Sequence, residues 1–273
     1  MKRIGIIAGY GRLPVIFARE AVKGGYQVFA VGVVPHVDSE LAHYAQVRVL
    51  PLGDWQGVLD TLHAWNIDDI YLLGKVSKEC LYTDGPFDDR FRQIVAALPE
   101  KNDNALLLAF VTDLNSEGFV VREQTDLLPS LIPAAGVLSA RWPQEQEWQD
   151  IALGFRIAKG VAGLDVGQTC VVKDGAVLAV EAIDGTDACI RRGGRLCKEG
   201  AVAMKVAKPH QDWRFDVPVI GLTTLEAAID GKAAVLAFEA NATFVMDKEQ
   251  LVTQADAAGI SLVSFHPTMA ANR

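Results

Sequence analysis

The sequence predicts an α/β fold, with a Rossmann-like N-terminal domain on a parallel sheet followed by a C-terminal α/β domain. Three observations support this prediction. Short apolar runs of strand length alternate with helical patterns through residues 1–128, as in a parallel sheet covered by helices. A glycine turn follows the first of these runs. A stretch rich in proline and polar residues, 129–147, reads as a linker that separates this half from residues 148–273.

Length and composition limit the function classes. The chain has 273 residues, half of them hydrophobic, which is enough for one large domain or two of ordinary size. The formal net charge is −8 at pH 7, so we expect no nucleic-acid partner. The four cysteines lack C-x-x-C spacing, which favours free thiols in a reducing compartment. The sequence shows no signal peptide and no apolar run of the ~18 residues that a membrane span needs, so it predicts a cytoplasmic protein.

The elements of the first domain follow one another as strand and helix. The first three form a βαβ unit, because an apolar run, a glycine turn and a helical pattern lead into a second apolar run. The predicted strands are residues 3–8, 26–34, 47–52, 70–73 and 118–121, and the predicted helices are residues 13–23, 57–65, 87–98 and 105–115.

The glycine turn is the first candidate site. Gly9 and Gly11 precede a helix that begins at Leu13, so their backbone could contact a phosphate or a nucleotide. A tight structural turn is the alternative interpretation. The spacing lacks the third glycine of the dinucleotide-binding motif, and Pro35 and His36 stand where an acidic residue would hold a ribose. Both features count against NAD.

A second glycine turn follows the strand over residues 70–73. Gly74, Lys75 and Val76 come directly after this buried run, and Ser77 is next. Because the carboxyl ends of parallel strands meet at one edge of a sheet, we expect this turn to lie on the same rim as the turn at Gly9.

The second domain begins with a helix and continues as a mixture of strands and helices. Asp174 and Gly175 form a strong hairpin signal between two of its strands. The predicted strands are residues 168–173, 176–182, 201–207, 233–238, 243–246 and 261–265, and the predicted helices are residues 148–163, 224–230 and 248–258, with one more starting at Ala188.

The most unusual stretch of this domain is KVAKPHQDWRFDVPVIGLTT. Apolar and charged residues alternate in it, which predicts a half-buried strand over 213–219 with one charged face. A charged face that merely meets water is an equally open interpretation. Pro218 stiffens the chain after Asp216, and Thr223 or Thr224 is placed to cap a following helix. We therefore expect the Asp216 carboxylate to lie beside a helix start, where a phosphate and its metal could bind.

Acidic and basic side chains occur together at the predicted strand ends and turns of the second domain. The acidic ones are Glu181, Asp184, Asp187, Asp212 and Asp216, and the basic ones are Arg191, Lys205, Lys208 and Arg214. Carboxylate oxygens suit Mg²⁺ or Mn²⁺, and interleaved cations suit a substrate that carries phosphate. A site of this kind can direct a water molecule at a phosphoryl group. None of the five histidines is predicted to be a metal ligand.

Five blocks of the sequence resemble the LpxI-type UDP-2,3-diacylglucosamine pyrophosphatases. The blocks are IAGYGRLP, GKVSK, KNDNALL, DVGQTCVVKDGAVLAVEAIDGTDACI and KVAKPHQDWRFDVPVIGLTT. They occur in the order of that family and span nearly the whole chain. The block with GTD and the block with RFDVP are the most specific, whereas the glycine turn is not specific.

The resemblance implies a Rossmann-like N-terminal domain, a C-terminal domain of its own type, and a substrate held between them. It implies Mg²⁺-dependent hydrolysis of the pyrophosphate of UDP-2,3-diacylglucosamine to UMP and 2,3-diacylglucosamine 1-phosphate (lipid X), with water attacking the phosphorus on the UMP side. This reaction is a step of lipid A synthesis in Gram-negative bacteria. A lipid substrate implies peripheral contact with the inner membrane from the cytoplasm.

The resemblance also assigns roles to residues. It implies that Asp216, in the R-x-D-x-P motif, is catalytic. The predicted substrate-binding residues are Gly9, Gly11, Leu13, Gly74, Lys75, Val76, Thr186 and Lys208, and the predicted ligands of Mg²⁺ (or Mn²⁺) are Asp216, Asp187 and Glu181. Tyr10 stands where many relatives have glycine, which departs from the family pattern.

Two other function classes stay open on the sequence. A nicotinamide-dependent oxidoreductase would use the βαβ unit, although the missing acidic residue counts against it. A non-catalytic sensor would bind a nucleotide-sugar lipid and report it by closing its domains. A homodimer formed by domain exchange through the proline-rich linker is also kept open.

Overall fold

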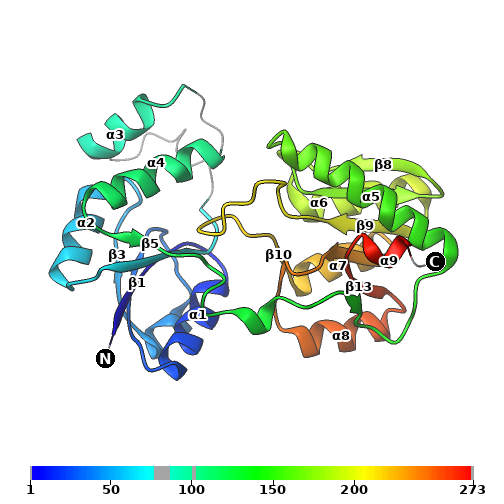
Figure 1. The fold of residues 1–273 in the computed structure, drawn as a ribbon, viewed down its shortest axis with the longest axis horizontal. Helices are drawn as coiled ribbons and strands as arrows, with labels where there is room; N and C mark the ends of the chain where they lie inside the picture. Colours follow the sequence, from blue (N-terminus) through cyan, green and yellow to red (C-terminus); the bar gives the residue numbers. More distant parts are fainter. Residues whose placement is uncertain (1, 77–86, 100–102, 272–273) are drawn as a thin grey trace. The chain divides into compact units, whose positions relative to one another are not determined.

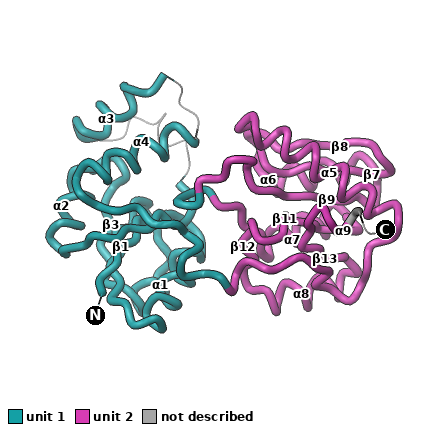
Figure 2. The backbone as a smooth tube through the Cα atoms, viewed as in Figure 1, with its two compact units in different colours: residues 1–129, 213–216 teal, residues 130–212, 217–273 magenta. Residues whose placement is uncertain are grey.

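The computed structural model describes the chain except residues 1, 77–86, 100–102 and 272–273 (Figure 1). The chain forms two compact units. Unit 1 comprises Met1–Pro129 and Trp213–Asp216, and unit 2 comprises Ser130–Asp212 and Val217–Arg273 (Figure 2). Each unit contains a sheet and helices, so the predicted α/β class is confirmed.

The sheet of unit 1 is parallel and has five strands in the order β3-β2-β1-β4-β5. The strands are β1 (Arg3–Ala8), β2 (Gln27–Gly32), β3 (Ala45–Val49), β4 (Asp69–Leu73) and β5 (Val120–Val121). The helices are α1 (Leu13–Lys23), α2 (Trp55–Ala64), α3 (Asp89–Ala96) and α4 (Asp103–Ser116), with a 3-10 turn η1 (Ser39–His43). The middle strands β1, β2 and β4 are almost entirely buried, which explains why they read as continuous apolar runs.

The sheet of unit 2 is mixed and has six strands in the order β6-β13-β11-β9-β7-β8. Its strands are β6 (Gly136–Val137), β7 (Thr169–Lys173), β8 (Ala176–Val180), β9 (Ala201–Lys205), β11 (Ala233–Glu239) and β13 (Ser261–Phe265). A separate parallel pair consists of β10 (Val219–Ile220) and β12 (Phe244–Val245). The helices are α5 (Glu145–Gly163), α6 (Gly185–Cys197), α7 (Leu222–Asp230), α8 (Lys248–Ala257) and α9 (Thr268–Ala271).

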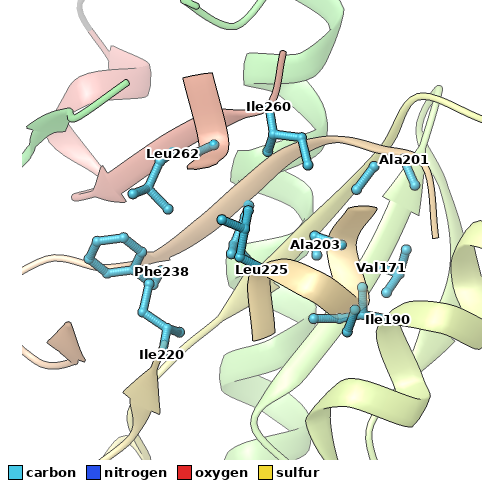
Figure 3. Close-up of a cluster of buried hydrophobic side chains, with 14 of the residues drawn as sticks. Val171, Ile190, Ala201, Ala203, Ile220, Leu225, Phe238, Ile260 and Leu262 are labelled. Carbon is cyan, nitrogen blue, oxygen red and sulfur yellow. The ribbon is translucent and has the colours of Figure 1, made fainter. Parts of the chain in front are cut away.

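Helices cover both faces of this mixed sheet. Successive side chains of its strands point to opposite faces and are apolar on both, so each face needs a covering layer. Ala203 on β9 packs into one buried cluster with Ile190 of α6 and Leu225 of α7 (Figure 3). Its neighbour Met204 packs into a second cluster with Trp148 of α5. A strand buried on both faces positions its ends rigidly, and the polar residues at those ends are therefore held in fixed places.

Residues 129–147, which the sequence predicts as a linker, have structure of their own. Pro129–Leu131 forms a 3-10 turn, η3, and β6 pairs antiparallel with β13. The hydroxyl of Ser139 accepts a hydrogen bond from the backbone N–H of Leu262, at 2.7 Å. These contacts with β13 explain why residues 130–147 belong to unit 2. Helix α5 begins at Glu145, where the N–H of Gln144 donates to the side chain of Glu147 at 2.7 Å.

Two local predictions about the RFDVP stretch are wrong. The predicted strand over 213–219 is a turn at its start, and only Val219–Ile220 is a strand. The reason is that Asp216 has a left-handed backbone, φ +52°, which interrupts an extended chain. The predicted threonine cap is also absent, because α7 begins at Leu222 with Gly221 at its N-cap, which leaves both threonines inside the first turn.

Helix α6 starts three residues earlier than Ala188 and continues through Gly193 and Gly194. A Cβ at Gly193 would lie 2.5 Å from a side-chain carbon of Val171, and one at Gly194 would lie 2.1 Å from the carbonyl oxygen of Gly231. The two glycines thus let the helix approach its neighbours closely. Over the described ranges, we find no helix long and apolar enough to cross a bilayer.

Candidate functional site

In unit 1, the two glycine turns are hydrogen-bonded to each other. The N–H of Tyr10 donates to the carbonyl of Lys75 at 2.8 Å, and the N–H of Lys75 donates to the carbonyl of Tyr10 at 2.9 Å. The N–H of Gly9 donates to the carbonyl of Leu73, also at 2.8 Å. The turns after β1 and β4 therefore lie on one rim of the parallel sheet, as the sequence predicts.

Glycine is required on both sides of this pairing. A Cβ at Gly9 would lie 2.5 Å from the carbonyl oxygen of Lys75, and one at Gly74 would lie 2.7 Å from that of Tyr10. Gly74 also has φ +88°, which disfavours any other residue. The amide of Tyr10 is bonded to Lys75, so this turn differs from a dinucleotide loop, whose amides face a phosphate.

The predicted binding residues of this rim differ in exposure. The side chains of Tyr10 and Val76 are 41% and 38% exposed, and Lys75 is exposed as well. Leu13 is 8% exposed and begins α1, so its side chain belongs to the core. Gly11, with φ +97°, has open space where a Cβ would be. Ser77 lies outside the described residues.

Asp216 is the last residue of the short segment Trp213–Asp216, which belongs to unit 1, although the chain on either side of this segment belongs to unit 2. It is exposed, whereas Phe215 is 2% exposed and packs in the hydrophobic cluster of unit 1. The backbone N–H of Gln124 donates to the carbonyl of Trp213 at 2.8 Å, which fixes the turn to the end of unit 1. The predicted catalytic aspartate is therefore presented by the unit that contains the glycine turns.

In unit 2, three predicted polar residues form one chain of hydrogen bonds. The ammonium of Lys205 donates to Oγ1 of Thr186 at 2.9 Å, and that hydroxyl donates to Oε1 of Glu181 at 3.0 Å. The other oxygen of Glu181, Oε2, accepts from the N–H of Gln168 at 3.2 Å. The end of β9, the first turn of α6 and the segment after β8 meet at this point.

Lys208 is held by an ion pair in the same unit. Its Nζ lies 2.7 Å from Oδ1 of Asp165, and 14% of its side chain is exposed. Its N–H donates to the side-chain oxygen of Gln211 at 3.2 Å. Asp165, the ion-pair partner of Lys208, lies in the turn after α5 and has a left-handed backbone, with φ +56°. The pairing limits where the Lys208 ammonium can point.

The two aspartates at the start of α6 have different surroundings. Asp184 accepts a hydrogen bond from the N–H of Ala182 at 3.0 Å and pairs with Arg192 at 3.0 Å. The hydrogen bond from the Ala182 amide holds the pKa of Asp184 below its usual value; burial opposes this shift, and the Arg192 guanidinium adds to it. Asp187 lies in the first turn of α6 and is half-buried. An acidic side chain there is favoured by the helix dipole.

Comparison with known proteins places this chain in a family. Residues 3–131 match the model of the LpxI N-terminal domain, and residues 134–263 match that of the LpxI C-terminal domain. A relative from Caulobacter vibrioides, named UDP-2,3-diacylglucosamine pyrophosphatase LpxI, is 30% identical over 98% of this chain and 99% of its own. The chain belongs to the LpxI family. The two LpxI models meet within a few residues of the boundary between the units at Pro129.

Two solved structures show only a weak likeness. UDP-glucose 4-epimerase of Thermotoga maritima with UDP-glucose has 8% identity and a TM-score of 0.28, covering 53% of this chain and 42% of that one. An ADP complex of N5-carboxyaminoimidazole ribonucleotide synthetase has 17% identity and a TM-score of 0.28, covering 67% and 41%. This chain spans less than half of either protein, and such TM-scores support no inference.

The predicted metal ligands of this LpxI chain have the chemistry of a Mg²⁺ site. Asp216 lies in unit 1 and Asp187 and Glu181 lie in unit 2, so their common role stays a prediction. Among the described residues, no group of three or more His, Cys, Asp or Glu side chains could hold a metal ion. Mg²⁺ is usually bound by one or two carboxylates together with substrate phosphates and water. Asp216 is exposed, which suits a ligand that shares a metal with substrate and water, and both oxygens of Glu181 accept hydrogen bonds within unit 2.

Two residues with structural consequences for the site are not predicted from the sequence. They are Asp165, which pairs with Lys208, and Gln124, which bonds Trp213. Gln124 gives no signal in the sequence, because its partner is far away along the chain and backbone hydrogen bonds leave no residue pattern.

Proposed function

We propose that this protein hydrolyses the pyrophosphate of UDP-2,3-diacylglucosamine. The observation that supports the proposal most is the relative that bears this activity in its name, which aligns with 98% of this chain at 30% identity. Because the alignment covers both domains, no large part of this chain lacks a counterpart in that relative. The products would be UMP and 2,3-diacylglucosamine 1-phosphate, and the reaction would serve lipid A synthesis.

The reaction breaks one phosphorus–oxygen bond of the diphosphate. A water oxygen attacks the phosphorus on the UMP side, the bond to the lipid phosphate breaks, and the released phosphate leaves as a monoester. In this proposal Asp216 directs the attacking water, because its exposed carboxylate is held on a fixed turn. A bound Mg²⁺ ligated by Asp216, with Asp187 and Glu181 as the candidates in unit 2, would polarise the phosphoryl oxygens.

The basic residues would balance the charge of the diphosphate. Lys75 in unit 1 is exposed in one of the paired glycine turns, and Lys208 in unit 2 is held by Asp165. Cations whose positions are set before the substrate arrives lose less entropy on binding than freely moving ones. The net charge of −8 makes such local cations necessary, since the surface as a whole repels a diphosphate.

The substrate also requires contact with a lipid phase. Two acyl chains hold UDP-2,3-diacylglucosamine in a membrane, so we propose that the protein works at the membrane surface as a peripheral protein. Binding that needs the acyl chains would be seen as a preference for the diacylated substrate over UDP-glucosamine.

A turnover assay tests the proposed function. The purified protein is incubated with UDP-2,3-diacylglucosamine in detergent micelles, with Mg²⁺ or with excess chelator, and UMP and the lipid phosphate are measured. We expect equal amounts of both products with Mg²⁺ and none with chelator. Tight binding without release of UMP in excess Mg²⁺ would contradict hydrolysis and favour a nucleotide-sugar sensor.

A further inference from the structure

We propose that Gln124 and Phe215 are positioning residues that fix Asp216 to unit 1. This inference rests on the proposed function, because it assigns to Asp216 the role described above. The segment Trp213–Asp216 is separated from the rest of unit 1 by more than eighty residues of unit 2, and it leaves unit 1 again at Val217. Short segments of this kind stay in place only if side chains or backbone bonds hold them.

We call Gln124 and Phe215 together the anchor of Asp216. Phe215 provides its apolar half. It is 2% exposed and lies in the same buried cluster as Ile70 of β4, Val121 of β5 and Val111 of α4. The cluster also contains side chains of α2 and α3, so it is a hydrophobic core of unit 1. A large aromatic side chain buried next to Asp216 fixes the backbone from which the carboxylate projects.

Gln124 provides the polar half. Its backbone N–H donates to the carbonyl of Trp213, at 2.8 Å, and its side-chain amide donates to the carbonyl of Leu72 on β4. The residue is 5% exposed, so both bonds are shielded from water. Because β4 continues into Gly74 and Lys75, Gln124 connects the Asp216 turn with the strand that ends in the paired glycine turns.

The anchor holds Asp216 in an exposed position with an uncommon backbone conformation. Asp216 is exposed between two buried residues, Phe215 at 2% and Val217 at 5%, and it has φ +52°. A left-handed aspartate is uncommon and persists where its surroundings determine it. The buried neighbours on both sides therefore present the carboxylate on a turn whose direction is set, and unit 1 contributes both the aspartate and the glycine turns.

The test compares the anchor with a matched position in the same core. Phe91 on α3 is also 2% exposed and belongs to the same cluster, so Phe91→Leu removes the same volume from an element that does not contain Asp216. We expect Phe215→Leu and Gln124→Ala to lower kcat by about tenfold or more with KM within about twofold, because a small displacement of a catalytic group affects the rate strongly. Phe91→Leu should lower thermal stability as much as Phe215→Leu does and leave kcat unchanged.

Hydrogen exchange gives a readout that does not depend on activity. In Phe215→Leu and Gln124→Ala, the amides of residues 213–217 should exchange faster than in the wild type, and Phe91→Leu should not have this effect. Equal kcat losses in all three variants, or unchanged exchange in the two anchor variants, would overturn the anchor. A wild-type protein that releases no UMP would instead overturn the proposed function, and exchange alone would then decide on the anchor.

Discussion

The two units hold their candidate residues by different physical means. The glycine turns of unit 1 are held by the backbone, because they pair through main-chain hydrogen bonds. Unit 2 uses side chains, in the chain from Lys205 through Thr186 to Glu181 and in the pair of Lys208 with Asp165. The glycine turns should therefore be sensitive to added atoms, and the candidate residues of unit 2 to removed polar atoms.

Gly9→Ala should have the largest effect on stability. The new Cβ would lie 2.5 Å from the Lys75 carbonyl oxygen, and because that atom belongs to the backbone it cannot rotate away. We expect the free energy of unfolding to fall by about 3 kcal/mol, as in severe overpacking. Urea unfolding of both proteins measures the difference.

The control for this substitution is Gly160→Ala in α5. A Cβ there meets nothing within 4 Å, and the position is helical, so alanine should raise stability by about 0.5–1 kcal/mol. If Gly9→Ala were as stable as the wild type, the paired turns would not be the rigid element that we describe.

Thr186→Val should have an intermediate effect on activity. Valine keeps the shape but removes the hydroxyl that accepts from Lys205 and donates to Glu181. We expect kcat/KM for UDP-2,3-diacylglucosamine to fall by about tenfold, the equivalent of one hydrogen bond to a charged group. Thr186→Ser, which keeps the hydroxyl, should retain most of the activity. A valine variant as active as the wild type would show that the chain of hydrogen bonds does not serve the reaction.

Asp184→Asn should have the smallest effect, and it should depend on pH. The folded pKa of Asp184 is lowered, so its charge stabilises the fold above the unfolded pKa of about 4 and this contribution disappears as pH falls through the folded pKa. Since the side chain is 32% exposed, the contribution should be less than ~1 kcal/mol. The difference in Tm between wild type and variant, measured from pH 6 to pH 3, should shrink on acidification. A difference that grows toward pH 3 would contradict the sign.

Much of the fold is predictable from the sequence, because the spacing of apolar residues and the residue types that form turns are local features of the chain. The buried strands β1, β2 and β4 and the hairpin at Asp174 follow from residues within one short window. The course of α6 through Gly193 and Gly194 does not, since glycine disfavours helices and only close packing against Val171 and Gly231 explains it.

The sequence predicts which residues of the candidate site carry its chemistry, but not which unit of the fold holds them. The motif identifies Asp216, and the strand ends identify the turns at Gly9 and Gly74. No local pattern shows that Phe215 packs in the core of unit 1, because its contacts are made with residues far away in sequence. The alternation correctly separates buried Phe215 and Val217 from exposed Asp216, but Trp213 and Arg214, predicted on opposite faces, are both half-buried. The predicted backbone is also wrong, since a turn with one left-handed residue can give the same local alternation.

The most direct test of the account is the rate of UMP release by Asp216→Asn. Asparagine tolerates a left-handed backbone, so the variant removes the charge and keeps the turn. Asp247→Asn is the matched control, because Asp247 is also exposed and left-handed, with φ +46°. We predict that Asp216→Asn lowers kcat by about 10³-fold while UDP-2,3-diacylglucosamine still binds, and that Asp247→Asn leaves kcat unchanged. A wild-type rate of UMP release by Asp216→Asn would contradict the account.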